Sequence, residues 1–469
     1  MKKIGIFCLC ICCMFSLLVV PSAATEETGQ ENKESGYHSV DATSARLGTG
    51  KIVDNVEAAF LYETHSDTLM YSYNADIPMD PAGFVKIITG YVAAEKGIMS
   101  DRVTVTESAM NSISSASVVL DIQVGEVLTL EDLMHCLLVR SANEAAVIIA
   151  EHISGSQTAF VAEMNRMAKE LGCTNTNFTN ATGLYDEEQL STARDIARIM
   201  EKALENEAFR RAFCAADYTV PKTNMSNERL LVTTNYLIYG NLGGVYYYID
   251  NRVLGGRVST TIYEKNMVAA VSQYGTMEMI SIVMGSDHKI SSSGYITTFG
   301  GYLETSALLN AGFANLKVAQ VLYENQTITQ LPVRYGDSDV ILGPKESAFA
   351  LIGENTTVSG LTFRYSNSGQ ELEAPIKKGD YISSLEIWSD GFCVAKTDLY
   401  AMNSVSRVEP VSEPITDSDI NNRKFGTVLI TIVIVIAVLI ALLYVYRQIS
   451  IIKARKRSQR NRQNRRRSR

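Results

Sequence analysis

The stretch PAGFVKIITGYVAAEKG, residues 81–97, predicts a helix that begins beside a small residue and is buried along one face. Its apolar residues recur with helical spacing, three or four apart, and are Phe84, Ile87, Ile88, Tyr91 and Val92. That spacing predicts an amphipathic helix over residues 83–97. At its start Gly83 and Lys86 stand three positions apart, so they share one helix face.

Further elements on both sides of this helix mix the two secondary-structure types. Strands are predicted by alternating or continuous apolar runs at residues 58–62, 68–73, 266–272 and 279–284. Helices are predicted by apolar periodicity at residues 130–139, 144–152, 157–171 and 193–203. Residues 51–315 are therefore expected to form one large α/β (α+β) domain.

The pattern changes at residue 316, from where short β-type runs alternate with turns. The runs lie at residues 317–323, 327–333, 339–342, 361–365 and 384–388. Turn signals such as Gly343-Pro344 and Asp390-Gly391 separate several of them. A small all-β domain is expected over residues 316–410.

The first fifty residues have the features of an exported protein. Lys2 and Lys3 precede an apolar run that ends in small residues at Ser22-Ala23-Ala24, so residues 1–24 are predicted to be a signal peptide. Residues 25–50 are rich in Glu, Gly, Ser and Thr and are expected to be a flexible lead-in.

The other end of the chain predicts a membrane anchor. Residues 425–446 are uncharged and mostly aliphatic, and as a helix they would span about 33 Å, enough to cross a bilayer. Residues 447–469 are basic without an acidic residue, which places this tail in the cytoplasm by the positive-inside rule. We therefore expect a single-pass protein of the cell membrane, with the large N-terminal part extracellular and residues 411–424 as a polar stalk. A basic tail could also bind nucleic acid, but a stop-transfer flank is the simpler interpretation, and no nucleic-acid partner is predicted.

Composition excludes several classes of function. The five histidines are scattered without H-x-x-x-H spacing, so no metal site is predicted, and no Gly-rich phosphate loop or other cofactor signature occurs. Half of the eight cysteines lie in the predicted signal peptide, and the others are far apart, so a disulfide framework is not expected. Cys136, inside an apolar helical stretch, is predicted to be a core residue. Apart from its basic tail the chain is acidic, a surface that anionic wall polymers would repel.

A second stretch, VRSANEAAVIIAEHISGSQTAFVAEMNRMAKELGCTNTNFTNATGL (residues 139–184), makes the chain resemble a known family. It is similar to the S-x-N element of D-alanyl-D-alanine carboxypeptidases among the low-molecular-mass penicillin-binding proteins, and residues 81–97 are similar to their S-x-x-K element. STARDIARIM, from Ser191, and LEAPIKKGDYISSLEIWSDG, residues 372–391, also fit, the latter to the C-terminal β-domain. The resemblance covers residues 51–410.

This resemblance implies a β-lactamase/transpeptidase-like fold and a serine peptidase mechanism without a cofactor. In the family the motif serine attacks the D-Ala-D-Ala peptide bond from a helix start, and the lysine three residues on takes its proton. The S-x-N serine helps to shuttle protons, and the asparagine orients the substrate. A K-T-G strand pairs with the substrate backbone and holds its terminal carboxylate.

Carried over residue by residue, the first two motifs match in part. Lys86, Ser141 and Asn143 occupy the expected positions of catalytic residues. The nucleophile position holds Gly83, which has no side chain to form an acyl-enzyme.

The third motif also departs from the family pattern. Aligning VLGGRVSTT, residues 253–261, puts Leu254 and Gly255 where the lysine and threonine belong and keeps only Gly256. Gly256 would let a ligand backbone approach closely, so it is a candidate substrate-binding residue. Arg257 is a second candidate, since it could bind a carboxylate bidentately, but strand alternation turns its side chain to the face opposite Gly256.

Structural interpretations of the same residues remain open. Lys86 could be an ordinary partly buried lysine, and Ser141 with Glu144 could form a capping box for the next helix. Leu254 could be a packed strand residue beside a flexible Gly255-Gly256 bend, and Arg257 a solvated strand residue.

The run Tyr246-Tyr247-Tyr248 has two interpretations. It could be an aromatic strand edge, or a stacking surface for glycan or peptide.

The nucleophilic serine is missing at Gly83, and the lysine and threonine of the third motif are missing as well. Both differences favour a catalytically inactive carboxypeptidase-like protein of the cell wall, acting as a membrane-anchored binding or scaffold protein. Its expected partner is a peptidoglycan stem peptide or a wall-associated protein; the oligomeric state stays open. The alternative is a weakly active D-Ala-D-Ala carboxypeptidase that uses another hydroxyl, such as Ser141. In a third hypothesis only the β-domain contacts a partner, and the larger domain is a spacer.

Overall fold

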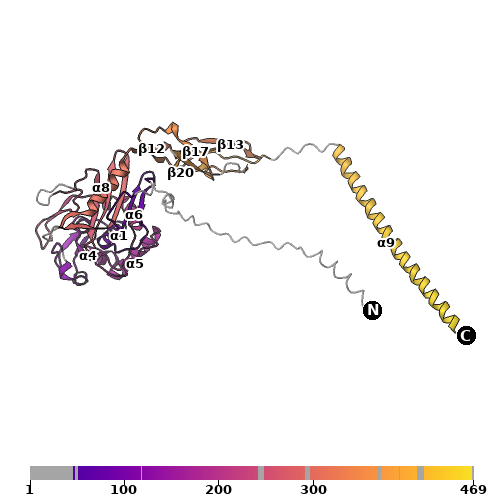
Figure 1. Ribbon diagram of the computed structural model, residues 1–469, viewed down its shortest axis with the longest axis horizontal. Coiled ribbons are helices and arrows are strands. Elements are labelled where there is room, and N and C mark those ends of the chain that lie inside the picture. Colours follow the sequence, from indigo (N-terminus) through magenta and orange to yellow (C-terminus); the bar gives the residue numbers. More distant parts are fainter. Residues whose placement is uncertain are drawn as a thin grey trace. The chain divides into compact units, whose positions relative to one another are not determined.

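The structure is a computed structural model of the chain (Figure 1). It describes residues 46–47, 51–117, 119–240, 248–290, 296–366, 371–389, 391–408 and 417–466. The predicted signal peptide, residues 1–24, and nearly all of the predicted lead-in, residues 25–50, lie outside the described residues.

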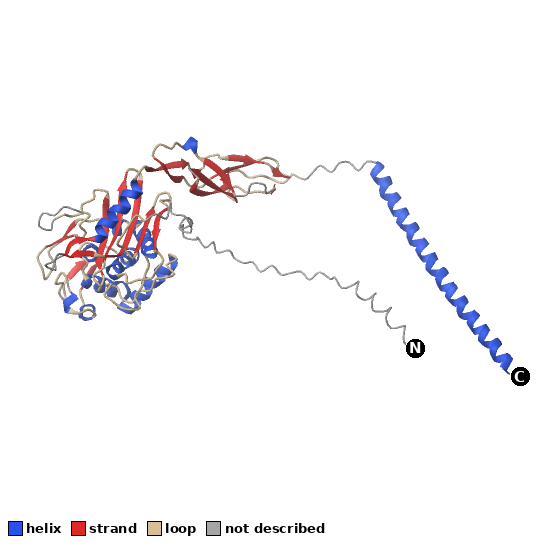
Figure 2. Cartoon of the chain, viewed as in Figure 1, coloured by secondary structure: helices blue, strands red, loops and turns tan. Residues whose placement is uncertain are grey.

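An antiparallel five-stranded sheet forms the centre of the α/β domain (Figure 2). In chain order its strands are β1 (Ala58–Glu63), β2 (Thr68–Tyr73), β7 (Val253–Thr260), β8 (Asn266–Tyr274) and β9 (Met277–Ser286). Their order across the sheet is β2-β1-β9-β8-β7, so the late strand β9 lies between the early strand β1 and β8. The four predicted strands correspond to β1, β2, β8 and β9.

Both faces of this sheet are covered by helices, which explains why its central strands are apolar almost throughout. On β1, Phe60 and Tyr62 pack into the core shared with the main group of helices, whereas Ala59 and Leu61 pack on the opposite face with α8 (Gly300–Phe313). Because side chains alternate along a strand, a sheet buried on both faces shows no polar positions in its middle.

The main group of helices agrees with the sequence prediction to within a few residues. It consists of α1 (Val85–Lys96), α3 (Leu130–Leu138), α4 (Asn143–Ser154), α5 (Gln157–Glu170), α6 (Ala193–Leu204) and α7 (Glu207–Phe213), of which α7 was not predicted. Short elements connect the larger ones: η2 (Ala82–Phe84), β3 (Arg102–Thr104), α2 (Glu107–Asn111), η3 (Ser115–Ser117), β4 (Val127–Thr129), β5 (Asp217–Val220), β6 (Arg229–Val232), β10 (His288–Ile290) and β11 (Ile296–Phe299). Cys136 on α3 is fully buried, as predicted, and Cys136, Cys173, Cys214 and Cys393 are free thiols.

Helix α1 is buried on all sides over its first nine residues, so the prediction of a single apolar face was wrong. Its polar Thr89 is satisfied inside the protein by hydrogen bonds to the carbonyls of Val85 and Ala181. A helix surrounded by other helices has no solvent face to keep polar. Lys86 therefore lies in the interior of the domain.

The part after residue 315 is rich in β-strands, as predicted, but three of its strands were missed. It contains β12 (Leu316–Leu322), β13 (Thr329–Leu331), β14 (Val333–Arg334), β15 (Val340–Gly343), β16 (Ala348–Gly353), η4 (Val358–Gly360), β17 (Thr362–Tyr365), β18 (Leu372–Glu373), β19 (Tyr381–Ser389) and β20 (Phe392–Ala401). One sheet has the strand order β13-β15-β20-β19-β17, and β12 pairs with β16. The sequence prediction did not include β16, β18 and β20.

The C-terminal helix α9 (Asp417–Arg466) contains the predicted membrane segment. Within the described part of the chain, one helix is long and apolar enough to cross a membrane, and it covers Thr427–Arg457. Since α9 begins at Asp417, the second half of the predicted stalk, residues 411–424, is helical.

The predicted tyrosine run is described at Tyr248 alone, since Tyr246 and Tyr247 lie outside the described residues. Tyr248 is in a turn, and its ring packs on Tyr302 and Phe299. Its hydroxyl accepts a hydrogen bond from the Phe299 amide at 3.0 Å. At this residue the run forms part of an internal aromatic cluster.

Candidate functional site

Gly83 lies in the tight turn η2 that leads into α1. The turn is confined: Ala82 has a positive φ of 40°, and its amide donates to the Asp80 carboxylate at 2.8 Å. A Cβ placed on Gly183 would lie 2.1 Å from the Ala82 carbonyl oxygen, so the 180–184 loop packs directly against the turn. Gly83 itself is not among the residues with positive φ. Its backbone conformation is therefore one that a serine could adopt.

Lys86 follows one helical turn later and is 3% exposed. Its Nζ donates hydrogen bonds to Asn143 Oδ1 at 2.7 Å and to the Thr182 carbonyl. Burial lowers the pKa of Lys86 well below its ordinary value of 10.5, the nearby charge of Arg257 lowers it further, and Glu144 opposes the shift. The structure thus brings Lys86 and Asn143 together, and it favours a neutral amine at position 86.

Ser141 and Asn143 lie at the turn between α3 and α4, but they do not form the predicted capping box. The N-cap of α4 is Ala142, and no side chain caps it. Glu144 instead accepts hydrogen bonds from the amides of Val119 and Leu120. Ser141 has a positive φ of 65°, and its hydroxyl accepts a hydrogen bond from Arg257 instead of from a helix amide.

The predicted capping box has a real counterpart one helix earlier. Thr129 accepts from the Asp132 amide, and the Asp132 carboxylate accepts from the Thr129 amide at 3.0 Å.

Arg257 on β7 is buried, so its interpretation as a solvated strand residue was wrong. Its Nη2 donates to Ser141 Oγ, its Nη1 to the Leu138 carbonyl at 3.3 Å and its Nε to the Gly83 carbonyl at 3.3 Å. Strand alternation does place Arg257 and Gly256 on opposite faces, but the face of Arg257 is the one directed at the helix start. The strand therefore presents a cation to Gly83 and Ser141.

This placement bears on the third motif. The cation that β7 directs at the start of α1 is Arg257, whereas Leu254, which the sequence alignment put in the place of the motif lysine, packs against the core. At the predicted bend, Gly255 and Gly256 lie within β7 and pair with β8, directly after a register shift between Val253 and Gly255. A Cβ on Gly256 would lie 2.6 Å from the Ala269 carbonyl oxygen and 2.8 Å from Asn235 Nδ2, so close packing within the domain explains this glycine.

Ser259 is the site residue that sequence reasoning missed. It lies two positions after Arg257 on the same strand face, and its Oγ accepts a hydrogen bond from the Gly83 amide at 2.8 Å. Period-two spacing from Arg257 is the only sequence signal that pointed to it, and that signal needed the correct register of β7.

The resulting cluster is electrostatically unusual. Lys86 and Arg257 are both buried, and the hydrogen-bond acceptors given above for them are carbonyl, amide and hydroxyl oxygens. Burial lowers the pKa of Arg257 to about 10, so the guanidinium still carries its charge at neutral pH. Such an environment favours an incoming anionic group. Among the residues that the structure describes, no cluster of three or more His, Cys, Asp or Glu side chains could hold a metal ion.

Comparisons with known proteins agree with this architecture. Residues 51–288 match the family model described as D-alanyl-D-alanine carboxypeptidase, and residues 317–407 match that of the penicillin-binding protein 5 C-terminal domain. The chain belongs to the D-alanyl-D-alanine carboxypeptidase family of penicillin-binding proteins.

The match to individual relatives extends over most of the length of both proteins. The chain is 30% identical over 378 residues to D-alanyl-D-alanine carboxypeptidase DacA of Haemophilus influenzae, covering 78% of this chain and 89% of that protein. It is 26% identical over 366 residues to DacF of Bacillus subtilis, covering 76% and 88%. The crystal structure of penicillin-binding protein 5 from Haemophilus influenzae is similar with a TM-score of 0.64 and 28% identity, covering 75% of this chain and 98% of that one.

Proposed function

We propose that this protein is a non-catalytic member of its family, which binds a cell-wall ligand reversibly and acts as a membrane-anchored binding or scaffold protein. The observation that carries the proposal is Gly83 at the start of α1, where no side-chain oxygen can form an acyl-enzyme. In another serine hydrolase, loss of the catalytic serine lowers turnover by about 10⁶.

The hydroxyl groups of Ser141 and Ser259 near Gly83 accept hydrogen bonds from Arg257 and from the Gly83 amide, and neither has a described contact with a base. Ser141 Oγ accepts from the buried Arg257, and the lysine expected to act as base is bonded to Asn143 and Thr182. A nucleophilic hydroxyl needs a base within hydrogen-bond reach. These contacts favour a binding function over a peptidase that uses Ser141.

The ligand that fits best is the end of a peptidoglycan stem peptide. The relatives are named for action on D-alanyl-D-alanine, a dipeptide that ends in a carboxylate. Arg257 keeps its charge at neutral pH in this buried site, and an anionic chain end would be stabilised there. With no acyl-enzyme, the ligand would dissociate unchanged.

The proposed location follows from the ends of the chain. Residues 1–24 would direct export, α9 would anchor the protein, and the basic residues that follow its apolar segment would keep the tail in the cytoplasm. The α/β domain and the β-domain would then face the cell wall.

D-alanine release by the purified full-length chain in detergent tests this function. A pentapeptide that ends in D-Ala-D-Ala serves as substrate, and a catalytic family member serves as positive control. We expect no D-alanine above background, together with reversible pentapeptide binding in calorimetry that weakens on Arg257→Met. D-alanine release that disappears in Ser141→Ala would contradict the proposal and support the alternative in which Ser141 is the nucleophile.

A further inference from the structure

Two side chains of β7 form hydrogen bonds with the backbone of Gly83, one with its N–H group and one with its carbonyl group. Its amide donates to Ser259 Oγ at 2.8 Å, and its carbonyl accepts from Arg257 Nε at 3.3 Å. Residues 83 and 259 are 176 positions apart in the chain, so the contact exists only in the folded protein. The strand thus satisfies both polar backbone groups of the residue that stands in the nucleophile position.

Ser259 also occupies the space that a side chain at residue 83 would need. A Cβ placed on Gly83 would lie 2.7 Å from Ser259 Oγ, 3.2 Å from Ser259 Cβ and 3.6 Å from Arg257 Nη2. The first distance is too short for a stable contact, so a serine at residue 83 requires the Ser259 hydroxyl to move. Because the φ of Gly83 is not positive, this space, rather than the backbone conformation, explains the glycine.

The hydrogen bond has a chemical consequence as well. In serine hydrolases the amide of the nucleophile itself is one of the donors that stabilise the oxyanion of the reaction. At residue 83 this amide already donates to Ser259 Oγ. A carbonyl oxygen of a bound peptide would have to displace the Ser259 hydroxyl to reach it.

With Arg257 in the place of the motif cation, Ser259 stands two positions later, where the K-T-G pattern has its glycine. The chain therefore has glycine where the first motif has serine, and serine where the third motif has glycine. We propose that this exchange is a matched pair. Ser259 occupies the space of a nucleophile side chain and accepts from the amide that would stabilise an oxyanion, and Gly83 is retained because it accommodates Ser259. This inference rests on the proposed non-catalytic function and adds the residue that keeps the site closed.

Covalent labelling by a fluorescent β-lactam tests the pair in four full-length variants: wild type, Gly83→Ser, Gly83→Ser/Ser259→Gly and Gly83→Ser/Thr260→Gly. Thr260 is the exposed neighbour of Ser259 on β7 and serves as the matched control. We expect the Ser259→Gly double variant to be labelled at least about tenfold more than Gly83→Ser, and the Thr260→Gly control to gain nothing. Equal labelling of Gly83→Ser and the Ser259→Gly double variant would overturn the inference. Labelling of the wild type would instead overturn the proposed function.

A thermal-stability cycle tests the same pair without any activity, and it decides the matter if no variant is labelled. Gly83→Ala adds only the Cβ, and we expect it to lower the melting temperature by several degrees in the wild-type background. In the Ser259→Gly background the same change should cost less than half as much, because the clash is gone. Equal losses in both backgrounds would show that residues 83 and 259 are independent and would refute the matched pair.

Discussion

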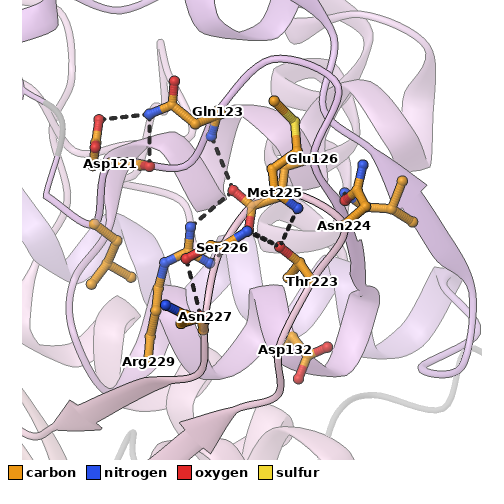
Figure 3. A network of polar contacts seen from close by, with 12 residues as sticks. Asp121, Gln123, Glu126, Asp132, Thr223, Asn224, Met225, Ser226, Asn227 and Arg229 are labelled. Atoms are coloured by element: carbon orange, nitrogen blue, oxygen red, sulfur yellow. Dashed lines mark hydrogen bonds and ion pairs between the residues drawn. The ribbon is translucent and has the colours of Figure 1, made fainter.

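Two buried charged clusters in the α/β domain differ in how their charges are compensated. In the first, Glu126 is fully buried and accepts two hydrogen bonds from Arg229, at 2.7 and 2.9 Å (Figure 3). Thr223 Oγ1 and the Gln123 amide donate to the same carboxylate. Every oxygen of Glu126 therefore has partners, and the cluster ties the loop before β4 to the β5–β6 hairpin.

The second cluster lies at the start of α1, where Lys86 and Arg257 are both buried and the described contacts supply neutral acceptors. A buried guanidinium without a contacting carboxylate, beside a buried amine that is costly to charge, costs stability, whereas a bidentate ion pair with further hydrogen bonds offsets its desolvation. The comparison teaches that the Glu126 cluster serves the architecture, while the uncompensated charge beside Gly83 is what the proposed ligand site would require.

The largest expected effect comes from breaking the compensated cluster. Arg229→Met would leave the buried Glu126 carboxylate without its cation, and we expect the free energy of unfolding to fall by about 3–5 kcal/mol. Urea denaturation measures this loss. Glu126→Gln/Arg229→Met removes both charges and should recover part of it; a double variant no more stable than Arg229→Met would argue against an architectural ion pair.

The second cluster should make the stability of the protein depend on pH, through Lys86. The pKa of Lys86 is lowered in the folded protein, so between that value and 10.5 the unfolded chain binds a proton that the folded chain does not. The contribution of Lys86 to the free energy of unfolding therefore rises with pH over that window, by at most about 1.4 kcal/mol per pH unit. At pH values below the window Lys86 is charged in both states, and its burial destabilises the folded protein by the full amount.

Lys86→Met lacks this titration, so the stability of the wild type relative to the variant should increase as the pH is raised towards 10. Thermal melting from neutral to alkaline pH compares the two. A constant or decreasing difference would mean that Lys86 is charged in the folded state.

The smallest effect concerns the helix cap beside the Glu126 cluster. Thr129→Ala removes the hydroxyl that caps α3, and we expect a loss of about 1 kcal/mol. Ser156→Ala at the N-cap of α5, where the serine also accepts from a helix amide, is the matched control and should cost a similar amount. A negligible loss at Thr129 alone would show that Asp132 supports the helix start without it.

Periodicity predicted most of the large elements, because burial imposes it directly on the sequence. It failed for α8, whose apolar residues are spread around the helix among glycines, and for β16, a short strand whose partner β12 is set by tertiary pairing. It also gave a single apolar face to α1, since a helix buried on all sides differs little in sequence from one buried on most sides.

The motifs located Lys86 and Asn143 but not the strand that completes the site. Anchoring the third motif on Gly256 left Ser259 unnoticed, and only the folded sheet shows that Arg257 and Ser259 face Gly83. The S-x-x-E pattern at Ser141 was equally ambiguous. A positive φ and the engagement of Glu144 by a distant loop are tertiary effects, invisible in local sequence.

The central claim, that this cleft cannot carry an acyl group, is tested most directly by the intact mass of the wild-type chain after incubation with benzylpenicillin. We predict an unchanged mass, because residue 83 offers no oxygen for attack. A mass increased by one penicillin, mapped by peptide analysis to any residue of the cleft, would contradict the account.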